Sequence, residues 1–243
     1  MKTLVVASGK GGTGKTTTTA NLGKAIAARG YKVALLDLDT AAPNLPRAAG
    51  VDPIGCDTDD DWFYPKKNGN VEVFSTSFLI PADVACAWTG NRRMEIAHEL
   101  LDRVKWDDPD ILICDSPPGM SDEFLGVLQY TLCIDGILIV TTGARASLDD
   151  ALRLIGMLRT ERYARPIVGA VENMGHTVAR NNRRTRLLSD GLDIEQVLGV
   201  PLIGSVPYRQ EVDLTDYDPI VDRILAFLEP REEREVKTEE EHE

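Results

Sequence analysis

The sequence lacks several features that would restrict its function class. Its 243 residues contain no run of about 18 apolar residues, so no membrane-spanning helix is expected. No signal peptide precedes the strand-like segment that starts at residue 3, and a cytoplasmic location is therefore predicted. A basic excess is also missing, because 27 Lys and Arg stand against 39 Asp and Glu, for a formal net charge of −12. This balance disfavours unspecific nucleic-acid binding but permits a local basic patch.

Cysteine is scarce, and its spacing lacks a metal signature. The four cysteines form no C-x-x-C or C-x-C pair, which is the usual signature of zinc or an iron–sulfur cluster within one chain. Cys114 and Cys133 lie in apolar runs and are predicted to be buried thiols. Cys56 and Cys86 lie in loop-like sequence, so metal binding by these two between subunits stays open. Without a secretion signal, disulfides are not expected.

The sequence does contain a glycine-rich loop at residues 9–17, where Gly9 to Thr16 satisfies G-x-x-x-x-G-K-[ST]. Residues 3–8 before it are apolar and β-branched, which is typical of a buried strand, and residues 18–29 after it have helical apolar spacing. Backbone N–H groups of such a loop bind phosphate together with the positive end of the helix. Lys15 is expected to reach the β- and γ-phosphates and Thr16 to ligate magnesium. A flexible glycine-rich hairpin is the alternative, and the flanking elements disfavour it.

Strands and helices alternate along the rest of the chain. This order predicts an α/β fold with a doubly wound, mostly parallel sheet of the P-loop NTPase type and helices on both faces. One domain is expected over residues 1–228 and a charged tail over residues 229–243, which has no apolar face for a membrane. Residues 40–70 look irregular. Further strands are expected at residues 32–39, 71–74, 110–115, 136–141, 166–171 and 201–206, and helices at 91–104, from 121, at 148–158 and at 220–228.

Acidic residues end two of the predicted buried strands. Asp37 and Asp39 close one, and Asp115 closes the other after four apolar residues, as in a Walker B strand. Because ligands of open α/β sheets gather outside the carboxyl ends of the strands, these acids are expected at the phosphate site. Capping or turn-forming acids are the alternative interpretation of Asp37 and Asp39.

Four segments together resemble the Mrp family of iron–sulfur carrier ATPases within the MinD/ParA superfamily. They are residues 8–17 with the early Lys10, the Asp37/Asp39 pair, residues 115–123, and residues 171–174. The resemblance implies ATP and magnesium as cofactors and a homodimer joined through ATP. In that dimer Lys10 would reach the partner's nucleotide; a surface lysine is the alternative.

The resemblance also implies residue roles. Asp39 would orient the attacking water, Asp115 would support magnesium with Thr16, and Asn173 would bind the adenine edge with the backbone around Pro207 beside it. No Asn-Lys-x-Asp sequence that reads guanine is present, which favours ATP over GTP. The phosphate-binding residues would be Gly11, Gly12, Thr13, Gly14, Lys15, Thr16 and Thr17.

The chain departs from the family where the iron–sulfur members carry a C-x-x-C, because residues 175–186 hold no cysteine. A bound iron–sulfur cluster is therefore not expected. The favoured function is a dimeric switch that hydrolyses ATP and acts on a protein client. The alternatives are a cluster carrier with unusual ligands such as Cys56 or Cys86, a ParA-like positioning ATPase that binds nucleic acid, and a nucleotide-sensing adaptor with little or no hydrolysis. The departing segment is a possible docking site for an acidic client, against the simpler interpretation of a solvated loop or helix face. Its arginines are Arg180, Arg183, Arg184 and Arg186.

Overall fold

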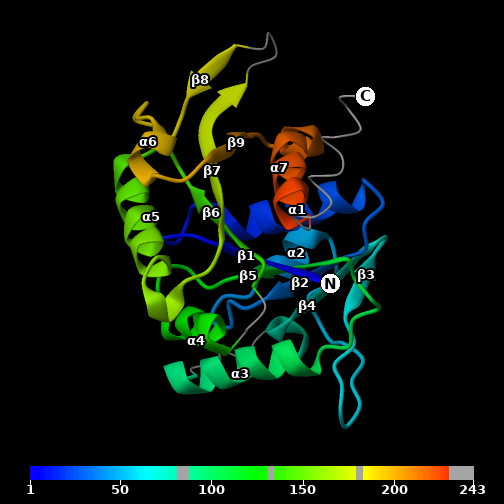
Figure 1. Cartoon of the computed structure of the whole chain (residues 1–243). Coiled ribbons are helices and arrows are strands. Elements are labelled where there is room, and N and C mark those ends of the chain that lie inside the picture. The colour runs from blue at the N-terminus through cyan, green and yellow to red at the C-terminus, as the bar shows by residue number, and fades with distance from the viewer. Residues whose placement is uncertain (81–87, 131–133, 179–182, 230–243) are drawn as a thin grey trace, which may run out of the picture.

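A nine-stranded sheet forms the centre of the computed structural model, with the strand order β3-β4-β2-β5-β1-β6-β7-β8 and β9 paired with β7 (Figure 1). The structure describes residues 1–80, 88–130, 134–178 and 183–229. The strands are β1 (Lys2–Ala7), β2 (Val33–Asp37), β3 (Lys66–Asn68), β4 (Val71–Ser75), β5 (Ile111–Asp115), β6 (Gly136–Thr141), β7 (Ile167–Val178), β8 (Arg184–Arg186) and β9 (Leu202–Tyr208). The helices are α1 (Lys15–Ala27), α2 (Leu45–Ala49), α3 (Gly90–Arg103), α4 (Asp122–Tyr130), α5 (Arg145–Leu158), α6 (Ile194–Leu198) and α7 (Asp218–Leu228), with short 3₁₀ turns at Thr76–Phe78, Glu161–Tyr163 and Leu214–Tyr217.

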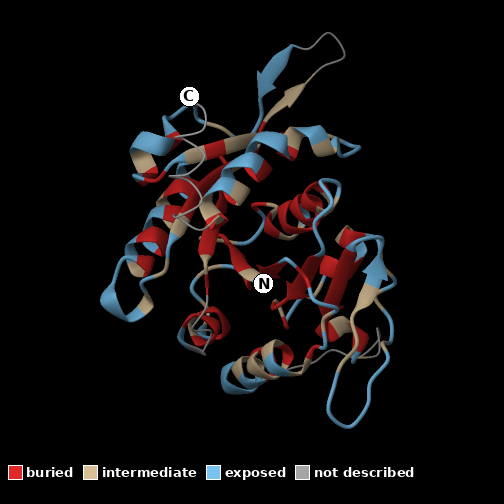
Figure 2. Ribbon diagram, turned by 45° about the vertical axis from the view of Figure 1, so that its right-hand side comes forward, coloured by how far each residue is buried: buried red, intermediate tan, exposed pale blue. Residues whose placement is uncertain are grey.

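The sheet is parallel except at its two ends, where β3 and β8 pair antiparallel to their neighbours. Helices α1, α2 and α7 cover one face, and α3, α4 and α5 lie on the other (Figure 1). The predicted doubly wound, mostly parallel sheet is therefore confirmed. Figure 2 shows that the residues of the central strands are buried, as expected for parallel strands covered by helices on both faces.

Strand β1 lies between β5 and β6, so the chain winds away from it in both directions. Strand order reverses at this point, and in open α/β sheets the crevice outside such a reversal holds the ligand. The register pairs Val6 and Asp37 with Asp115 on either side of β5. The acidic strand ends are thus brought together at one edge of the sheet, as expected.

Two segments differ from the sequence-based prediction. Residues 40–70 contain the helix α2 and the strand β3. The strand expected at residues 166–171 continues to Val178, because β7 pairs with β9 and then with β8. The segment around Arg184 is therefore a β-hairpin and neither a loop nor a helix face; Arg180 lies outside the described residues.

The cysteine predictions are only partly covered by the described residues. Cys114 is buried in β5, as predicted, and Cys56 is half-buried. Cys86, Cys133 and residues 230–243 of the tail lie outside the described part of the chain. None of the described helices is both long and apolar enough to span a membrane.

Candidate functional site

The glycine-rich loop connects β1 to α1 at the reversal point of the sheet. Gly12 and Gly14 have φ angles of 79° and 82°, in the left-handed region that favours glycine. Gly14 also has no space for a side chain, since an added Cβ would lie 2.1 Å from Nδ2 of Asn173. The loop is thus curled with the N-terminus of α1 behind it, which is the backbone arrangement that binds phosphate.

Three predicted residues meet beneath this loop. Lys15 Nζ donates to Asp115 Oδ1 at 2.8 Å, and Thr16 Oγ1 donates to Asp115 Oδ2 at 2.6 Å. The side chains of Lys15 and Asp115 are only 7% and 1% exposed. A buried carboxylate beside a hydroxyl and an ammonium group is the donor set expected for a magnesium-bound phosphate.

Threonines around the loop add to this arrangement. The Thr19 hydroxyl donates to Asp115 Oδ1 at 3.0 Å, a contact that the sequence analysis missed. Thr13 Oγ1, on the loop itself, is buried without a hydrogen-bond partner among the described residues. Such an unpartnered buried atom is uncommon, and a bound phosphate ligand would explain it. The residues present therefore fit ATP with magnesium.

Asp37 lies in the interior rather than in the crevice. Its Oδ2 accepts from the Leu45 amide at 3.1 Å and from the Ser75 hydroxyl at 3.0 Å. Burial, and then the charge of Asp115, raises the pKa of Asp37 to about 8. The carboxyl group thus joins the start of α2 to the end of β4.

Lys10 and Asp39 line the same open cavity of about 310 Å³ in front of the loop, together with residues 11–17 and Pro118. Asp39 Oδ1 accepts from the Ala42 amide at 3.1 Å, so its own loop orients the carboxylate. The structure brings both residues to the phosphate cavity, and their proposed roles in hydrolysis remain predictions.

A second cavity of about 160 Å³ lies beside Gly14 and Thr17, which line both cavities. Asn173 and Pro207 border it, and Asn173 Nδ2 donates to the Thr13 carbonyl at 2.8 Å; their role in binding the base stays a prediction. This bond uses one amide hydrogen, so the amide oxygen and the other hydrogen stay available to a base edge.

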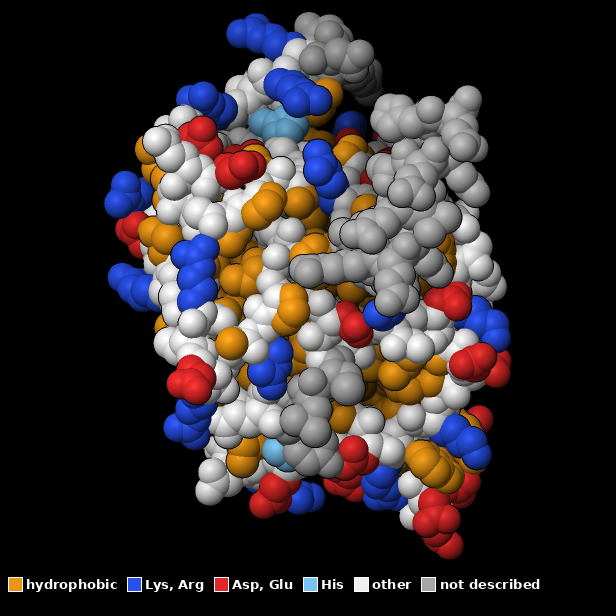
Figure 3. Space-filling model, viewed as in Figure 1, with side chains coloured by type: hydrophobic (Ala, Val, Ile, Leu, Met, Phe, Trp, Pro, Cys, Tyr) orange, Lys and Arg blue, Asp and Glu red, His pale blue; other side chains and the backbone are white. Residues whose placement is uncertain are grey.

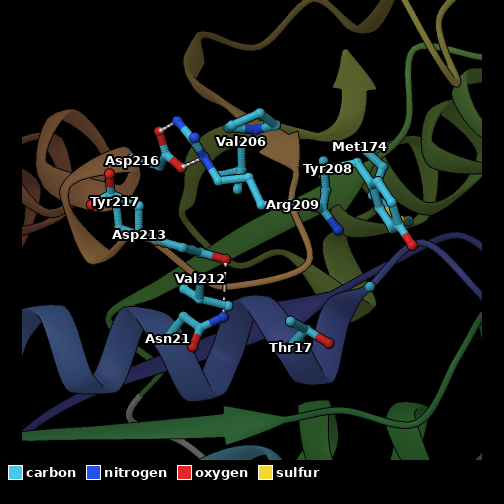
Figure 4. A pocket seen from close by; sticks show the side chains of 13 residues that line it. Thr17, Asn21, Met174, Val206, Tyr208, Arg209, Val212, Asp213, Asp216 and Tyr217 are labelled. Atoms are coloured by element: carbon cyan, nitrogen blue, oxygen red, sulfur yellow. Dashed lines mark hydrogen bonds and ion pairs between the residues drawn. The ribbon is translucent and has the colours of Figure 1, made fainter. Parts of the chain in front are cut away.

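Figure 4 shows side chains around this cavity that the sequence analysis missed. Arg209 holds Asp216 through two bonds of 2.7 and 3.1 Å, and Asn21 Nδ2 approaches the Tyr217 hydroxyl at 3.4 Å. These residues carry no motif, and only the folded chain brings α1 beside the segment after β9.

Comparison with known proteins identifies the family. The family model described as "ParA: NUBPL iron-transfer P-loop NTPase" matches residues 1–226. The chain belongs to this ParA family. It is accordingly a P-loop NTPase of the MinD/ParA type, as the motifs predicted.

Curated relatives of this ParA-family chain carry iron–sulfur names. It is 31% identical over 211 residues to the iron-sulfur cluster carrier protein of Rickettsia conorii, covering 87% of this chain and 62% of the relative. It is 33% identical over 228 residues to a cytosolic Fe-S cluster assembly factor NUBP2 homolog of Trichoplax adhaerens, covering 88% and 84%. The chain thus spans about three fifths of the Rickettsia relative's length.

Solved structures that are similar to this ParA-family chain agree with the family assignment. A nucleotide-binding protein of Archaeoglobus fulgidus in complex with ADP matches with a TM-score of 0.69 and 28% identity, covering 94% of this chain and 89% of that one. The cell division ATPase MinD of Pyrococcus furiosus matches with a TM-score of 0.67 and 24% identity, covering 93% and 98%; at this identity the likeness concerns the fold.

A further group of hydrogen-bonded side chains in this ParA-family site links the segment that follows Asp39 to the segment that follows Asp115. The buried Glu123 at the start of α4 accepts from the Thr40 hydroxyl at 3.2 Å and from Arg93 of α3 at 3.4 Å. From the sequence, only the start of a helix at residue 121 was expected here. The partners lie 83 and 30 residues away, so no sequence spacing could reveal them.

Proposed function

We propose that this P-loop NTPase hydrolyses ATP and acts as a dimeric switch on a protein client. The observation that carries the proposal is the cluster of Lys15, Thr16 and Asp115, which lies beside a cavity lined by Lys10 and Asp39. A binding-only protein needs the phosphate cradle alone. A carboxylate in front of the cradle supplies the additional group that positions an attacking water.

The roles of the residues follow from their places. N–H groups of residues 11–17 would hold the phosphates, Lys15 would neutralise their charge, and Thr16 with Asp115 would hold magnesium. When bound, magnesium supplies positive charge to the transferring phosphoryl group. Asp39 would orient the water, and Lys10 would reach the nucleotide of the second copy.

Base binding and the domain limits complete the proposal. Asn173 and the backbone at Pro207 would flank adenine in the cavity of about 160 Å³. Residues 1–228 would form one ATPase domain, with residues 229–243 as its charged tail.

Light scattering with and without ATP, together with phosphate release, tests the switch. We expect the molar mass of the protein to double when ATP is added, and to return to the value of one chain as phosphate is released. An unchanged mass together with undetectable hydrolysis would overturn the proposal, and it would leave a nucleotide-sensing adaptor.

An iron–sulfur cluster carrier is the second candidate function, and the names of the curated relatives favour it. The described thiols offer little support, because Cys114 is fully buried and burial raises its pKa to about 12. Among the described residues no group of three or more His, Cys, Asp or Glu is arranged for a metal ion. A cluster carrier would instead use unusual ligands such as Cys56 or Cys86, which could also bind metal between subunits.

Anaerobic reconstitution followed by an absorption spectrum and iron analysis separates the two candidates. We expect no cluster spectrum from wild type. Iron near one cluster per dimer that is lost in Cys56→Ser or Cys86→Ser would assign the carrier function instead.

A further inference from the structure

The hairpin of β7 and β8 lies at the end of the sheet, beyond the part of β7 that pairs with β6. β7 pairs with β6 only as far as Glu172, and residues 176–178 pair with β8. Figure 1 shows the two strands rising away from the other elements. We call the described residues 176–178 and 183–188 the basic arm.

The arm concentrates positive charge in an acidic chain. No acidic residue occurs between Glu172 and Asp190, whereas Arg183, Arg184 and Arg186 are all exposed. Figure 3 shows Lys and Arg side chains gathered at the top of this face, over the arm. An exposed basic surface on a chain with net charge −12 selects strongly for an acidic partner.

The guanidinium groups of Arg184 and Arg186 differ from those of seven other arginines of the described chain. Elsewhere seven arginines form ion pairs with carboxylates: Arg29, Arg92, Arg93, Arg103, Arg145, Arg153 and Arg209. Neither Arg184 nor Arg186 has a carboxylate partner among the described residues. Their charge is therefore available for an external ligand.

A groove runs beside these two arginines. One cavity of about 490 Å³ is lined by both, and an adjoining cavity of about 350 Å³ shares Arg184, His176 and Ser205 with it. Arg186 lies over Gly191, where an added Cβ would come within 2.1 Å of Nη1, so the guanidinium group has a defined place.

The carboxylates that face the groove already have partners. Glu172 accepts from the Ser205 hydroxyl at 2.7 Å, Asp193 caps α6 by accepting from the Gln196 amide, and Asp216 holds Arg209. Burial, and then the charge of Arg184, lowers the pKa of His176, so this ring adds hydrogen bonding rather than charge at neutral pH.

Apolar side chains adjoin the arginines. Leu187, Leu188 and Leu192 are between 37% and 47% exposed, and Leu192 lines the larger cavity. Arg184 and Arg186 are two residues apart on one strand, so they lie on the same side and about 7 Å apart. An extended peptide places carboxylates at i and i+2 with the same spacing, and each guanidinium can pair with one through two bonds.

We propose that the basic arm is the docking surface for an extended acidic segment of the client protein, with an apolar residue of that segment on the leucines. The inference rests on the proposed client-dependent switch for its purpose, while the docking itself requires no hydrolysis. A nucleic-acid ligand is disfavoured, because the repulsion by the acidic chain grows with the length of a polyanion.

The groove also adjoins the nucleotide site. The smaller cavity shares Pro207, Arg209 and Asp216 with the cavity assigned to the base. At the root of the arm, Asn173 holds the Thr13 carbonyl of the phosphate loop. Client docking and nucleotide binding are thus next to each other, and any effect of one on the affinity of the other must be reciprocal.

Fluorescence anisotropy tests the docking on the full chain. The probe is a labelled 12-residue peptide of three Glu-Leu-Glu-Gly repeats, and a Lys-Leu-Lys-Gly peptide is its control. We expect Arg184→Glu/Arg186→Glu to weaken binding of the acidic peptide by about tenfold or more. The matched Arg162→Glu/Arg223→Glu variant makes the same charge change at exposed arginines elsewhere, and we expect it to stay within about twofold of wild type.

Circular dichroism and ATP titration of both variants verify the fold, and they also separate failure of docking from failure of the proposed function. The proposal is wrong if wild type binds both peptides equally or if the two variants weaken binding equally. Tighter binding of a DNA duplex through the same arginines would assign the arm to nucleic acid instead. Loss of the ATP-dependent dimer in the arm variant, with ATP affinity unchanged, would assign the arm to a second copy of the chain.

Discussion

The phosphate site and the basic arm use positive charge in opposite ways. Lys15 is buried and bonded to Asp115, so its position is fixed by the fold. Arg184 and Arg186 are exposed on an edge strand, and no carboxylate of the described chain holds them. A buried charge needs a partner within its own chain, because burying it unpaired costs free energy. An exposed charge without a partner costs little, so it remains available to bind another molecule.

One strand connects the two regions. Asn173 of β7 reaches the phosphate loop, and the next residue, Met174, has a φ of 57°, which is uncommon outside glycine. Beyond this point β7 leaves the core and pairs with β8. The same strand therefore contacts the phosphate loop at its buried part and forms the arm at its exposed part.

The largest expected effect separates the two regions most sharply. Lys15→Ala removes the cation expected to neutralise the phosphates of the bound nucleotide, and we expect ATP affinity to fall by about 100-fold or more. Calorimetry measures the affinity, with Lys105→Ala as a control at a lysine that lies over Trp62. Binding of the acidic peptide to the arm should be unchanged in both variants. Unchanged ATP affinity would refute the phosphate-site assignment.

The sequence was sufficient to predict the parts of the site that lie within one motif or at a strand end. The loop at residues 9–17 and Asp115 were found because the residue order itself positions backbone amides and a carboxylate. The contact of Glu123 with Thr40 and Arg93 was missed, because long-range packing alone makes it. The extension of β7 was missed because its polar residues resemble a loop until β8 and β9 pair with them.

Lys10 and Asp39 allow a finer test within the phosphate cavity. Lys10→Ala should leave ATP binding by the monomer nearly intact but weaken ATP-dependent dimerisation by about tenfold, since only a contact across the dimer is lost. Asp39→Ala should stop hydrolysis and preserve the ATP dimer. Light scattering and phosphate release measure both effects. If Lys10→Ala forms the ATP dimer as readily as wild type, Lys10 is a surface lysine.

A smaller effect is expected where the segments after Asp39 and Asp115 meet. Glu123→Ala leaves the buried Thr40 hydroxyl and Arg93 without their shared acceptor, and should lower the free energy of unfolding by about 1–3 kcal/mol. Glu123→Gln retains an oxygen for Thr40 and should cost less. Denaturant unfolding measures both, with Glu95→Ala as the exposed control, which breaks a surface ion pair with Arg92. Equal effects of Glu95→Ala and Glu123→Ala would show that the buried contact stabilises the fold no more than an exposed ion pair does.

The smallest effect belongs to the arm itself. Arg184→Ala/Arg186→Ala removes exposed side chains that bond no carboxylate among the described residues, so the free energy of unfolding should change by less than about 0.5 kcal/mol. The strand pairing of β8 uses backbone groups, which the substitution keeps. Denaturant unfolding provides the measurement, and the same samples should lose affinity for the acidic peptide. A destabilisation as large as that of Glu123→Ala would mean that these arginines support the fold. The basic arm would then resemble the phosphate site, whose charged side chains make contacts within the chain, and the contrast between the two regions would be lost.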